Sequence, residues 1–383
     1  MALKWARGPI LRRLPLSDVD GAPFQYAMPD PALELVHHVD RDASGQIAMR
    51  EQVVNPDTRD RYIVSSLIEE AITSSQLEGA VTTRRVAKEM IRTGRKPRDR
   101  SEQMIFNNYY AMQHVREVAK GELTPDLVLR LHRIVTEGTL DDPASAGRLR
   151  REGEVVHVVD QYNEVLHTPP PACQLEERLG AMCDFANGKI PSQFIHPVIR
   201  TIVLHFWLAF DHPFVDGNGR TARALFYWSM LSQGYWLCEF IAISPFLRKA
   251  PARYVRAFLY SETDDNDITY FILYHLELIR GAIDELHRYL ARKAAELRRT
   301  ESILRQSAHF NHRQLALLGH ALRHSDARYS IRSHMTSHGV VYETARTDLF
   351  DLADKGLLLR KKIGRTYYFS VPSDLEARLR DLA

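Results

Sequence analysis

The sequence predicts a mainly α-helical protein that carries a separate C-terminal domain of short helices and strands. Three observations point to this fold class. Apolar residues recur at three- and four-residue steps from Tyr62 onward. The segment 198–210 is apolar on nearly every face and is too long for a buried strand. Near the C-terminus, three short helical patterns precede two strand-like runs around a basic, glycine-containing turn.

Composition excludes several classes of protein. The chain has 383 residues, 45% of them hydrophobic, and a formal net charge of +3. That length suffices for roughly two or three packed domains, and the charge by itself indicates neither a nucleic-acid nor a membrane partner. The three cysteines, Cys173, Cys183 and Cys238, are too sparse for a disulfide framework or a metal motif. We therefore expect the protein to reside in the reducing cytoplasm. No apolar run approaches the ~18 residues of a membrane span, and we expect no export signal.

Residues 1–60 are rich in Pro, Asp and Gly and predict an extended arm with at most a short strand or helix. A helix is expected from Tyr62 to about Gly79. Further helices are expected over 101–119, 124–138, 174–187 and 197–210. The exception is 153–171, where two β-branched runs flank a turn at Asp160–Glu164 and prolines stop the second run. We expect a β-hairpin that projects from the helices.

Helical patterns resume after Arg220 and end in a long, increasingly charged helix. A new unit begins near Ser302. Its three helical patterns are NHRQLALLGHALRH, SIRSHMTSHG and VYETARTDLFDLADKG, and they precede the strand pair LLLRKKIGRTYYFSV. Three short helices and a two-stranded wing predict a winged helix-turn-helix domain.

The densest chemistry lies in HPFVDGNGR, residues 212–220. The Gly-Asn-Gly stretch 217–219 forms a loop with little side-chain bulk, so its N–H groups can close on an anion. The helix that begins at Arg220 adds the positive end of its dipole. Phosphate is the natural ligand for such a loop.

Charged side chains flank this loop. Asp216 offers an oxygen to Mg²⁺, which usually bridges a carboxylate to phosphate oxygens. Arg220 and Arg223 lie three apart on a helix, so both guanidinium groups can face one polyphosphate. His212 is left as the proton acceptor. These parts indicate phosphoryl or nucleotidyl transfer, in which a base takes the proton of the attacking hydroxyl and charge neutralisation supplies most of the catalysis.

Two other motifs share some of these letters. Residues 217–222 formally satisfy GxGxxA, the dinucleotide-binding fingerprint, but that fingerprint follows a strand of a parallel sheet, and here a long buried helix precedes it. A P-loop is excluded because no Lys-Ser/Thr pair follows the glycines. Both are therefore set aside.

The segment HPFVDGNGRTAR matches the signature HxFx(D/E)GNGRxxR at every defined position, and residues 60–290 as a whole resemble the Fic family. The resemblance implies a helical enzyme that transfers AMP from ATP, with Mg²⁺, to a Ser, Thr or Tyr hydroxyl of a target protein. It implies His212 as general base, Asp216 as Mg²⁺ ligand and a buried Phe214. The residues that it assigns to the nucleotide phosphates are Gly217, Asn218, Gly219, Arg220 and Arg223.

The resemblance extends to the surroundings of the motif. Tyr254 falls where the family has residues near the adenine. The hairpin 153–171 corresponds to the family's flap, which aligns the backbone of the target protein by strand addition. His205, inside the apolar helix, is interpreted instead as a packed core histidine.

A second stretch, TSSQLEGA at 73–80, resembles the family's inhibitory pattern (S/T)xxxE(G/N) through Ser74, Glu78 and Gly79. Alone, the spacing is weak and fits a helix with a solvated Glu78. N-terminal to a full catalytic signature, it predicts a carboxylate that reaches Arg223 and occupies the cation meant for the γ-phosphate. The enzyme would then be autoinhibited. The same Glu78 could position water for removing AMP, and the sequence does not separate the two directions.

A DNA-binding transcriptional regulator is the alternative from a different class. The polar and basic side chains that would face DNA from the second helix and the wing are Tyr342, Thr344, Arg346, Thr347, Arg360, Lys361, Lys362 and Arg365. Such domains also serve as protein docking or dimer surfaces, so DNA, a protein partner and a homodimer stay open. The same unit has six histidines, but no cysteine or carboxylate joins them in a spacing that is typical of a zinc site. We therefore expect these histidines to lie on solvated helix faces. These are His309, His312, His320, His324, His334 and His338.

We therefore expect three parts. An N-terminal arm and inhibitory helix region occupies 1–100, a Fic-type helical catalytic core with the hairpin flap occupies 101–290, and a winged helix-turn-helix domain occupies 300–383.

Overall fold

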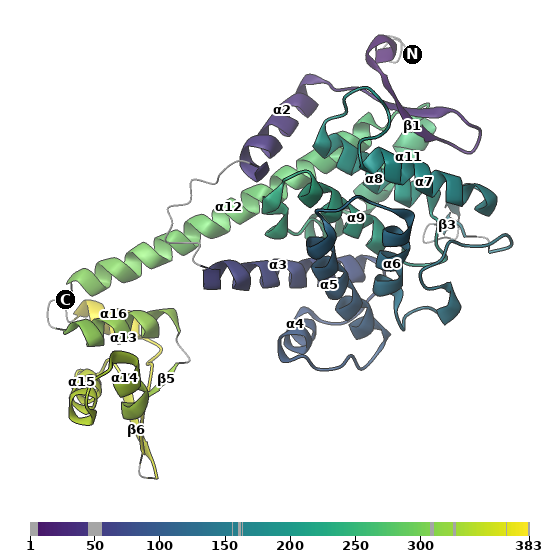
Figure 1. The fold of residues 1–383 in the computed structure, drawn as a ribbon. Coiled ribbons are helices and arrows are strands. Elements are labelled where there is room, and N and C mark those ends of the chain that lie inside the picture. Colours follow the sequence, from purple (N-terminus) through teal and green to yellow (C-terminus); the bar gives the residue numbers. More distant parts are fainter. Residues whose placement is uncertain are drawn as a thin grey trace. The chain divides into compact units, whose positions relative to one another are not determined.

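A computed structural model describes residues 7–44, 56–154, 156–159, 162, 164–306, 310–324, 327–364 and 366–381. The chain divides into two compact units, Met1–His287 and Arg288–Ala383 (Figure 1). The long helix α12 (Thr269–Gln306) begins in the first unit and ends in the second. Helices dominate the described residues, which confirms the predicted mainly α fold class.

The first unit is a bundle of helices. Before α12 its α-helices are α2 (Asp30–Val39), α3 (Pro56–Leu77), α4 (Arg84–Thr93), α5 (Arg100–Val118), α6 (Pro125–Thr136), α7 (Leu175–Ala186), α8 (Pro197–Asp211), α9 (Asn218–Ser232), α10 (Ser244–Lys249) and α11 (Pro251–Thr263). Short 3-10 turns are η3 (Pro143–Ser145), η4 (Ala172–Gln174) and η5 (Trp236–Glu239). The four helices predicted between residues 101 and 210 end within two residues of their expected bounds.

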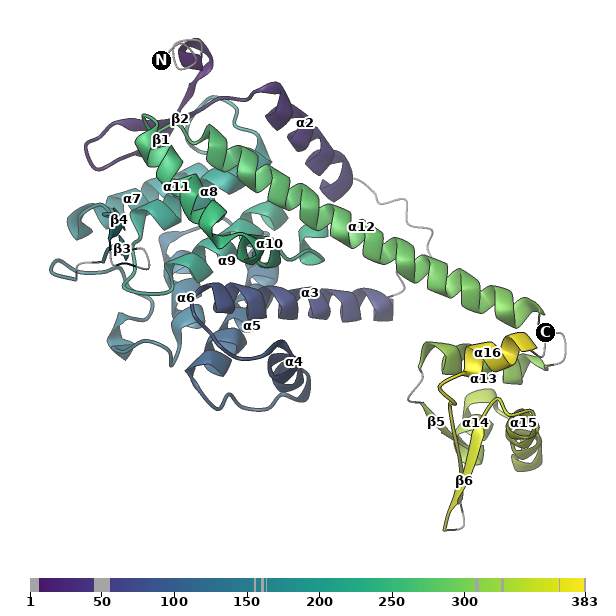
Figure 2. The same cartoon turned by 180° about the vertical axis from the view of Figure 1, so that it is seen from behind.

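Helix α8 forms the centre of this bundle because its sequence leaves no polar face (Figure 1, Figure 2). Every residue from Val198 to Asp211 except Ala209 is buried. α9 and α7 pack against it, and α5 and α6 pack against α9. The core therefore fixes both ends of the loop that joins α8 to α9 and carries the HPFVDGNGR motif.

A smaller apolar cluster holds α3 and α4 to α5. Its buried members are Ile68, Ala71, Ile72, Ala87, Met90 and Ile105. α4 lies outside the predicted elements, and it is short and polar, with only Ala87 and Met90 of its 10 residues buried. This cluster fixes the position of α3, whose last turn carries the TSSQLEGA stretch.

The N-terminal arm carries more structure than predicted. Two strands form an antiparallel hairpin, and Phe24 and Tyr26 of the second strand are buried. The Phe24 ring lies edge-on to Phe206 and Phe210 of α8, with ring centroids 5.2 and 4.9 Å away. The arm is thus part of the core. Its elements are η1 (Gly8–Ile10), β1 (Arg12–Ser17), β2 (Pro23–Tyr26), α2 and η2 (Asp40–Ser44).

The hairpin expected over 153–171 is present but short. β3 (Val158–Val159) and β4 (Val165–His167) pair antiparallel. Asp160 and two other residues of the predicted turn lie outside the described residues. The prolines after β4 end the pairing because proline has no N–H for a ladder.

The second unit has its own apolar core, in which Leu318, Leu349, Leu352 and Phe369 are fully buried. Its elements are α13 (His312–Arg323), β5 (Arg328–Ser330), α14 (Ile331–His338), α15 (Tyr342–Asp354), β6 (Leu359–Ile363), β7 (Thr366–Ser370) and α16 (Leu375–Asp381). The sheet order is β5-β7-β6. The three expected helices and the wing strands occur in the expected order, and β5 and α16 are additions. Arg365 and His309 lie outside the described residues.

One expectation for the second unit is wrong. His334 is not on a solvated helix face. It is buried because α14 packs on α15, and its Nε2 lies 3.1 Å from Asp348 Oδ2. Among the described residues, no group of three or more His, Cys, Asp or Glu could hold a metal ion.

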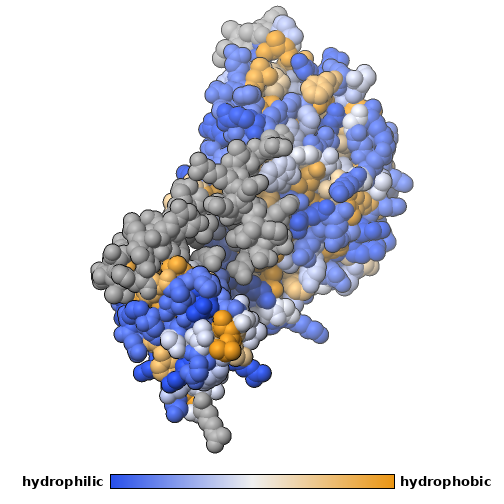
Figure 3. Space-filling model, turned by 60° about the vertical axis from the view of Figure 1, so that its left-hand side comes forward, coloured by the Kyte–Doolittle hydropathy of each residue, from blue (hydrophilic) through white to orange (hydrophobic). Residues whose placement is uncertain are grey.

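No helix within the described ranges is long and apolar enough to cross a membrane. The face of the first unit drawn in Figure 3 intersperses hydrophobic with hydrophilic residues. Exposed hydrophobic side chains come from several elements, with Phe194 73% and Val81 85% exposed.

Candidate active site

His212 ends α8 in a left-handed conformation, with φ 43° and ψ 56°. Its Nδ1 lies 3.3 Å from the carbonyl oxygen of Ala209. Because only an N–H can donate to a carbonyl, Nδ1 carries the proton and Nε2 is left as an acceptor. Burial lowers the pKa of His212 to about 4, partly offset by the bond to Ala209. The imidazole is therefore neutral near pH 7, which is the form that a general base requires.

The loop after His212 is held from within. The Asn218 side chain accepts a hydrogen bond from Phe214 N–H at 3.0 Å and donates one to the Phe214 carbonyl at 2.8 Å. Phe214 is fully buried, as expected. The Asn218 side chain thus fixes the shape of the loop, and its backbone begins α9.

His132 of α6 packs against the loop. Its ring stacks on Phe214, with centroids 3.7 Å apart and planes 4° from parallel. Nδ1 accepts from Gly147 N–H at 2.9 Å, so Nε2 carries the proton that it donates to the Asp216 carbonyl, also at 2.9 Å. Burial lowers the pKa of His132 to about 4. The neutral ring satisfies both partners, and nothing in the sequence pattern identified this residue.

Two glycines of the loop have no room for a side chain. Gly217 has φ +88°, and a Cβ there would lie 2.6 Å from Thr136 Cγ2 and 3.3 Å from His132 Cδ2. A Cβ on Gly219 would collide with Oε1 of Glu78. The first glycine lets the loop lie on α6, and the second leaves space that the Glu78 carboxylate fills.

Glu78 reaches this space from the end of α3. Gly79 adopts φ +91°, and its N–H donates to the Gln76 carbonyl at 3.3 Å. Ala80 N–H donates to the Ser75 carbonyl at 3.0 Å. These two bonds form a Schellman motif, in which a left-handed glycine ends the helix. The sequence pair Glu-Gly therefore places Glu78 at the helix cap, where its side chain meets α9.

Arg223 on α9 is buried and bonds to the end of α3 through Nε and Nη2. Its Nη2 lies 2.7 Å from Glu78 Oε1 and donates to the Ser74 carbonyl at 3.0 Å, and its Nε donates to Ser74 Oγ at 2.7 Å. Burial alone would lower the pKa of Arg223, but Glu78, together with Tyr254 and Glu70, outweighs burial and raises that pKa. Ser74, Glu78 and Arg223, singled out in sequence, thus meet at one point.

Arg220 takes a different direction from Arg223. Its side chain is fully buried, and Nη1 donates to the Val135 carbonyl of α6 at 2.7 Å. Nη2 lies 3.3 Å from Asp216 Oδ2. The Asp216 side chain is 42% exposed. The two arginines therefore bond to different helices, while Asp216 keeps a carboxylate at the loop surface. A lone exposed carboxylate suits Mg²⁺, which keeps several waters and takes further oxygens from phosphate.

Tyr254 and His205 bond to each other beside α9. The Tyr254 hydroxyl lies 2.8 Å from His205 Nε2. His205 is fully buried, and burial lowers its pKa well below the ordinary value. The interpretation of His205 as a core histidine is in keeping with this burial. Tyr254 lies near enough to Arg223 for its hydroxyl to interact with the guanidinium group.

The hairpin is tied to the His212 turn at two points that the sequence did not indicate. His167 of β4 has Nε2 at 2.7 Å from the Phe210 carbonyl and Nδ1 at 2.7 Å from Glu262 Oε2. Arg150 donates from Nε to the His212 carbonyl at 3.1 Å and from Nη2 to the Pro170 carbonyl. The only sequence signal was that His167 immediately precedes the strand-ending Thr-Pro-Pro-Pro run.

The central residues match a known protein family. Residues 122–230 match the model described as the Fic/DOC family. This region is a Fic/DOC domain. The Fic domain contains α6, the hairpin, α7, α8 and most of α9, and therefore the whole His212 loop.

Named relatives share this domain. Protein adenylyltransferase Fic from Nematostella vectensis is 34% identical over 119 residues, which are 31% of this chain and 25% of that protein. Protein adenylyltransferase fic-1 from Caenorhabditis elegans is 33% identical over 114 residues, 30% of this chain and 20% of that protein. The chain thus spans about a quarter or less of the length of these relatives.

Solved structures share the fold over a longer stretch. A Fic family protein from Desulfovibrio desulfuricans superimposes with a TM-score of 0.62 at 19% identity, covering 91% of this chain and 98% of that one. A Fic domain containing signaling protein from Bacteroides thetaiotaomicron superimposes with a TM-score of 0.53 at 17% identity, covering 67% of this chain and 94% of that one. The Fic fold therefore continues beyond the matched 122–230.

Proposed function

We propose that the protein is an adenylyltransferase that moves AMP from ATP to a Ser, Thr or Tyr hydroxyl of a target protein and releases pyrophosphate. The observation that carries the proposal is the turn between α8 and α9. There a neutral histidine with a free Nε2 precedes a side-chain-free loop at a helix N-terminus. Such a loop binds phosphate, and the imidazole accepts the proton of the attacking hydroxyl. The names of the relatives support the same activity.

Each motif residue has a place in this proposal. The backbone N–H groups of Gly217, Asn218 and Gly219 bind the α- and β-phosphates. Arg223 contacts the γ-phosphate once Glu78 has moved away. Arg220 neutralises charge from beneath the loop, where it already borders Asp216, and Tyr254 lies near the adenine.

Asp216 would hold Mg²⁺ together with phosphate oxygens and water. A bound Mg²⁺ neutralises charge that develops on the phosphates. The residue fits this role because its carboxylate is the exposed one at the loop. The protein's own contribution is to keep that carboxylate at the edge of the phosphate site.

The resting enzyme is restrained by Glu78. Its carboxylate stands against Gly219 and bonds Arg223. A nucleotide that enters with Glu78 in place loses the arginine contact, so its α-phosphate lies out of line with the attacking hydroxyl. The same Glu78 carboxylate can also position water for removing AMP from a modified target.

The target protein is proposed to align along the flap, residues 153–171. β3 and β4 form a two-stranded sheet, so among the described residues each strand has one unpaired edge. An extended segment of the target can add to such an edge through main-chain hydrogen bonds. Its hydroxyl would then approach His212, because His167 and Arg150 tie the flap to the His212 turn.

Intact-mass spectrometry tests the activity directly. The full chain with Glu78→Gly is incubated with ATP and Mg²⁺, alone and with a mixture of candidate proteins. An AMP adduct on the chain or on an added protein is the expected result, and His212→Ala in the same background should show none. Absence of any adduct, with ATP bound to the protein, would refute the proposal.

We propose that the second unit is a winged helix that binds DNA, although the names of the relatives do not favour a DNA-binding regulator. All five residues of β6 are exposed, and Arg360, Lys361 and Lys362 are consecutive on it. Three adjacent cations on a wing suit the phosphates of a DNA backbone.

A mobility-shift assay of the full chain tests DNA binding. Lys361→Glu should weaken binding and lower its salt dependence. Lys120→Glu in the first unit is the control. Binding that responds equally to both changes, or no binding at low salt, would exclude this use.

Three further expectations from the sequence stay predictions. These are the division into 1–100, 101–290 and 300–383, a homodimer, and a cytoplasmic location. Sedimentation equilibrium of the full chain tests the dimer.

A further inference from the structure

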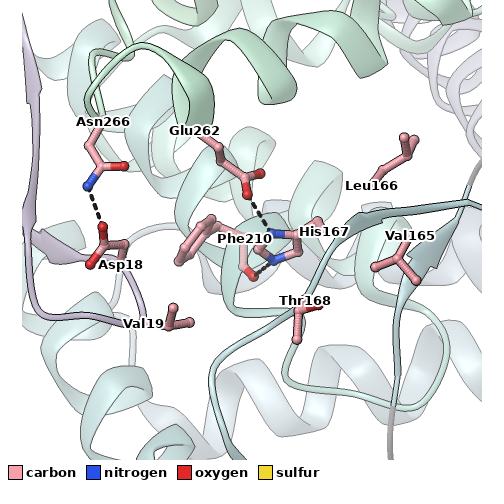
Figure 4. A pocket seen from close by; sticks show the side chains of 9 residues that line it. All are labelled: Asp18, Val19, Val165, Leu166, His167, Thr168, Phe210, Glu262 and Asn266. Carbon is pink, nitrogen blue, oxygen red and sulfur yellow. Dashed lines mark hydrogen bonds and ion pairs between the residues drawn. The ribbon is translucent and has the colours of Figure 1, made fainter.

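A pocket of about 270 Å³ lies beside the flap strand β4 (Figure 4). Four separate parts of the chain supply its walls: the turn between β1 and β2, strand β4, the last turn of α8, and the end of α11 with the residues that follow. The lining residues are Asp18, Val19, Val165, Leu166, His167, Thr168, Phe210, Glu262 and Asn266. None of them has a role in the phosphate site described above.

The pocket borders the path proposed for the target protein. Val165 belongs to β4, where the target would add, and its side chain is 53% exposed. Phe210 precedes His212 by two residues, a rise of about 3 Å along a helix. A residue close to the acceptor hydroxyl in an extended target segment would therefore pass this opening.

The charge of the lining selects against anions. Asp18 and Glu262 are carboxylates on different walls, and no Lys or Arg lines the pocket. Asp18 Oδ2 accepts from Asn266 Nδ2 at 2.7 Å, and Asp18 Oδ1 accepts from Ala22 N–H at 2.8 Å. Burial would raise the pKa of Asp18, but these hydrogen bonds outweigh it and lower that pKa. The carboxylate thus stays ionised.

Glu262 keeps one oxygen for a ligand. Its Oε2 lies 2.7 Å from His167 Nδ1, while within the described part of the chain Oε1 has no hydrogen-bond partner. The two ring nitrogens of His167 face oxygen acceptors, Glu262 Oε2 and the Phe210 carbonyl, so the ring that donates to both is a cation paired with Glu262. Neither N–H points into the pocket. The polar group that remains available to a bound ligand is therefore the Oε1 atom of Glu262.

The remaining walls are apolar. In Figure 4 the Phe210 ring lies between the two carboxylates, with Val19 below Asp18 and Val165 on the opposite side of the pocket. The volume is below the roughly 300–1,000 Å³ of sites for small-molecule ligands. Apolar walls with acids around them suit a long side chain that buries its methylene stem and keeps a cationic head.

We propose that this pocket is a subsite for an arginine or lysine side chain of the target protein, close to the modified hydroxyl. The proposal rests on the proposed adenylyl transfer, since it assumes that the target lies along the flap. It names a feature of the substrate: a basic residue beside the acceptor. Phosphate, nucleotide and acidic segments are disfavoured because the ionised Asp18 carboxylate and the open Glu262 oxygen would repel them, and the His167 cation is already paired with Glu262.

Methyl NMR tests binding without any need for catalysis. The full chain is labelled at valine and leucine methyl groups and titrated, without nucleotide, with two short peptides. The peptides are identical except that arginine or glutamate flanks one central tyrosine. The arginine peptide should shift the Val19 and Val165 methyl signals with a Kd about fivefold or more below that of the glutamate peptide, and the difference should shrink with salt.

Matched variants assign the effect to the pocket. Asp18→Asn and Glu262→Gln remove the charges while they keep the side-chain shape and one acceptor oxygen each, and together they should abolish the preference. Glu89→Gln, an exposed carboxylate on α4 away from the pocket, should leave it unchanged. Equal shifts with both peptides, no shift at these methyls, or an unchanged preference in the double variant would overturn the proposal.

The same peptides separate the subsite from the reaction. In the Glu78→Gly background, AMP transfer to the arginine peptide should exceed transfer to the glutamate peptide. Transfer to both without preference would remove the subsite and leave the activity standing. A methyl preference with no AMP transfer to any substrate would remove the activity and leave the subsite standing.

Discussion

His212 and Arg223 hold the two functions that the proposed transfer needs, a proton acceptor and a phosphate-binding cation. Both are set by neighbours that are remote in sequence. Burial keeps His212 neutral, while Ser74 and Glu78, more than 140 positions away, bond Arg223. In the proposed reaction the base is therefore ready, whereas the cation is occupied by Glu78.

Glu78→Gly should raise the rate of AMP incorporation at least about tenfold, because a charged hydrogen bond contributes ~1.5–3 kcal/mol and 1.4 kcal/mol is a factor of ten. Incorporation of radiolabelled AMP measures the rate. Ser74→Ala removes only one of the Arg223 contacts and should give a smaller increase. A rate in Glu78→Gly equal to that of the unaltered protein would contradict the restraint.

The pH profile of kcat/KM for ATP should be flat from about pH 6 to 8, because the pKa of His212 in the free enzyme is about 4. The neutral base is then fully populated throughout this range, and the rate falls only as pH drops toward 4. Measurement is made in the Glu78→Gly background. An inflection near 6.5, the ordinary value for histidine, would mean that a solvated histidine, and not the buried His212, limits the reaction.

The C-terminal turn of α3 is a helix cap with a function beyond stability. Gly79 and Gly94 end α3 and α4 in the same left-handed conformation, with φ +91° and +68°, and both have open space where a Cβ would point. They differ in what the cap holds. The residue before Gly79 is Glu78, which bonds Arg223, whereas the residue before Gly94 is Thr93, which bonds only within α4.

Gly79→Ala and Gly94→Ala should therefore cost similar stability, about 1 kcal/mol each, because alanine resists a positive φ. Only Gly79→Ala should also raise AMP incorporation, since it disturbs the turn that aims Glu78. Thermal unfolding and the radiolabel assay measure the two effects. Equal incorporation in both variants, at the level of the unaltered protein, would show that the cap does not set the position of Glu78.

The first unit buries several imidazoles in its neutral core. The pKa of His132, His212 and His275 is lowered to about 4 by burial. Below pH 6.5 the unfolded chain binds a proton on each of them and the folded chain does not, so stability is fully present above pH 6.5 and is lost as pH falls toward 4. Acid therefore acts on the whole bundle and not only on the active site.

Unfolding by urea should show this loss between pH 6.5 and 5, at up to about 2 kcal/mol for each of these three histidines and for His205, whose pKa burial also lowers. His275→Gln, which cannot take up a proton, should lose about a quarter of the slope. A free energy of unfolding that stays constant from pH 6.5 to 5 would contradict the burial of these rings.

Much of the catalytic motif was predictable because it is local. His212 to Arg223 are consecutive along one turn and one helix, so spacing alone places the base and the two arginines on or beside the bare loop, although it does not give the direction of each arginine side chain. The uniform apolar pattern of 198–210 predicts a buried helix, and that helix is observed. The pairing of Glu78 with Arg223 was accessible only through the resemblance to a family pattern.

The sequence by itself determined most helices between residues 101 and 306, the position of the bare glycine loop and that a separate unit follows the long helix. Tertiary structure alone decided that Arg220 turns to α6 and that His132 carries the loop. It also decided that His167 links flap to α8 and that four distant segments enclose an acidic pocket. The reason is physical: helix and strand periods are written in neighbouring residues, whereas partners of buried polar groups are chosen only when helices pack and remove water.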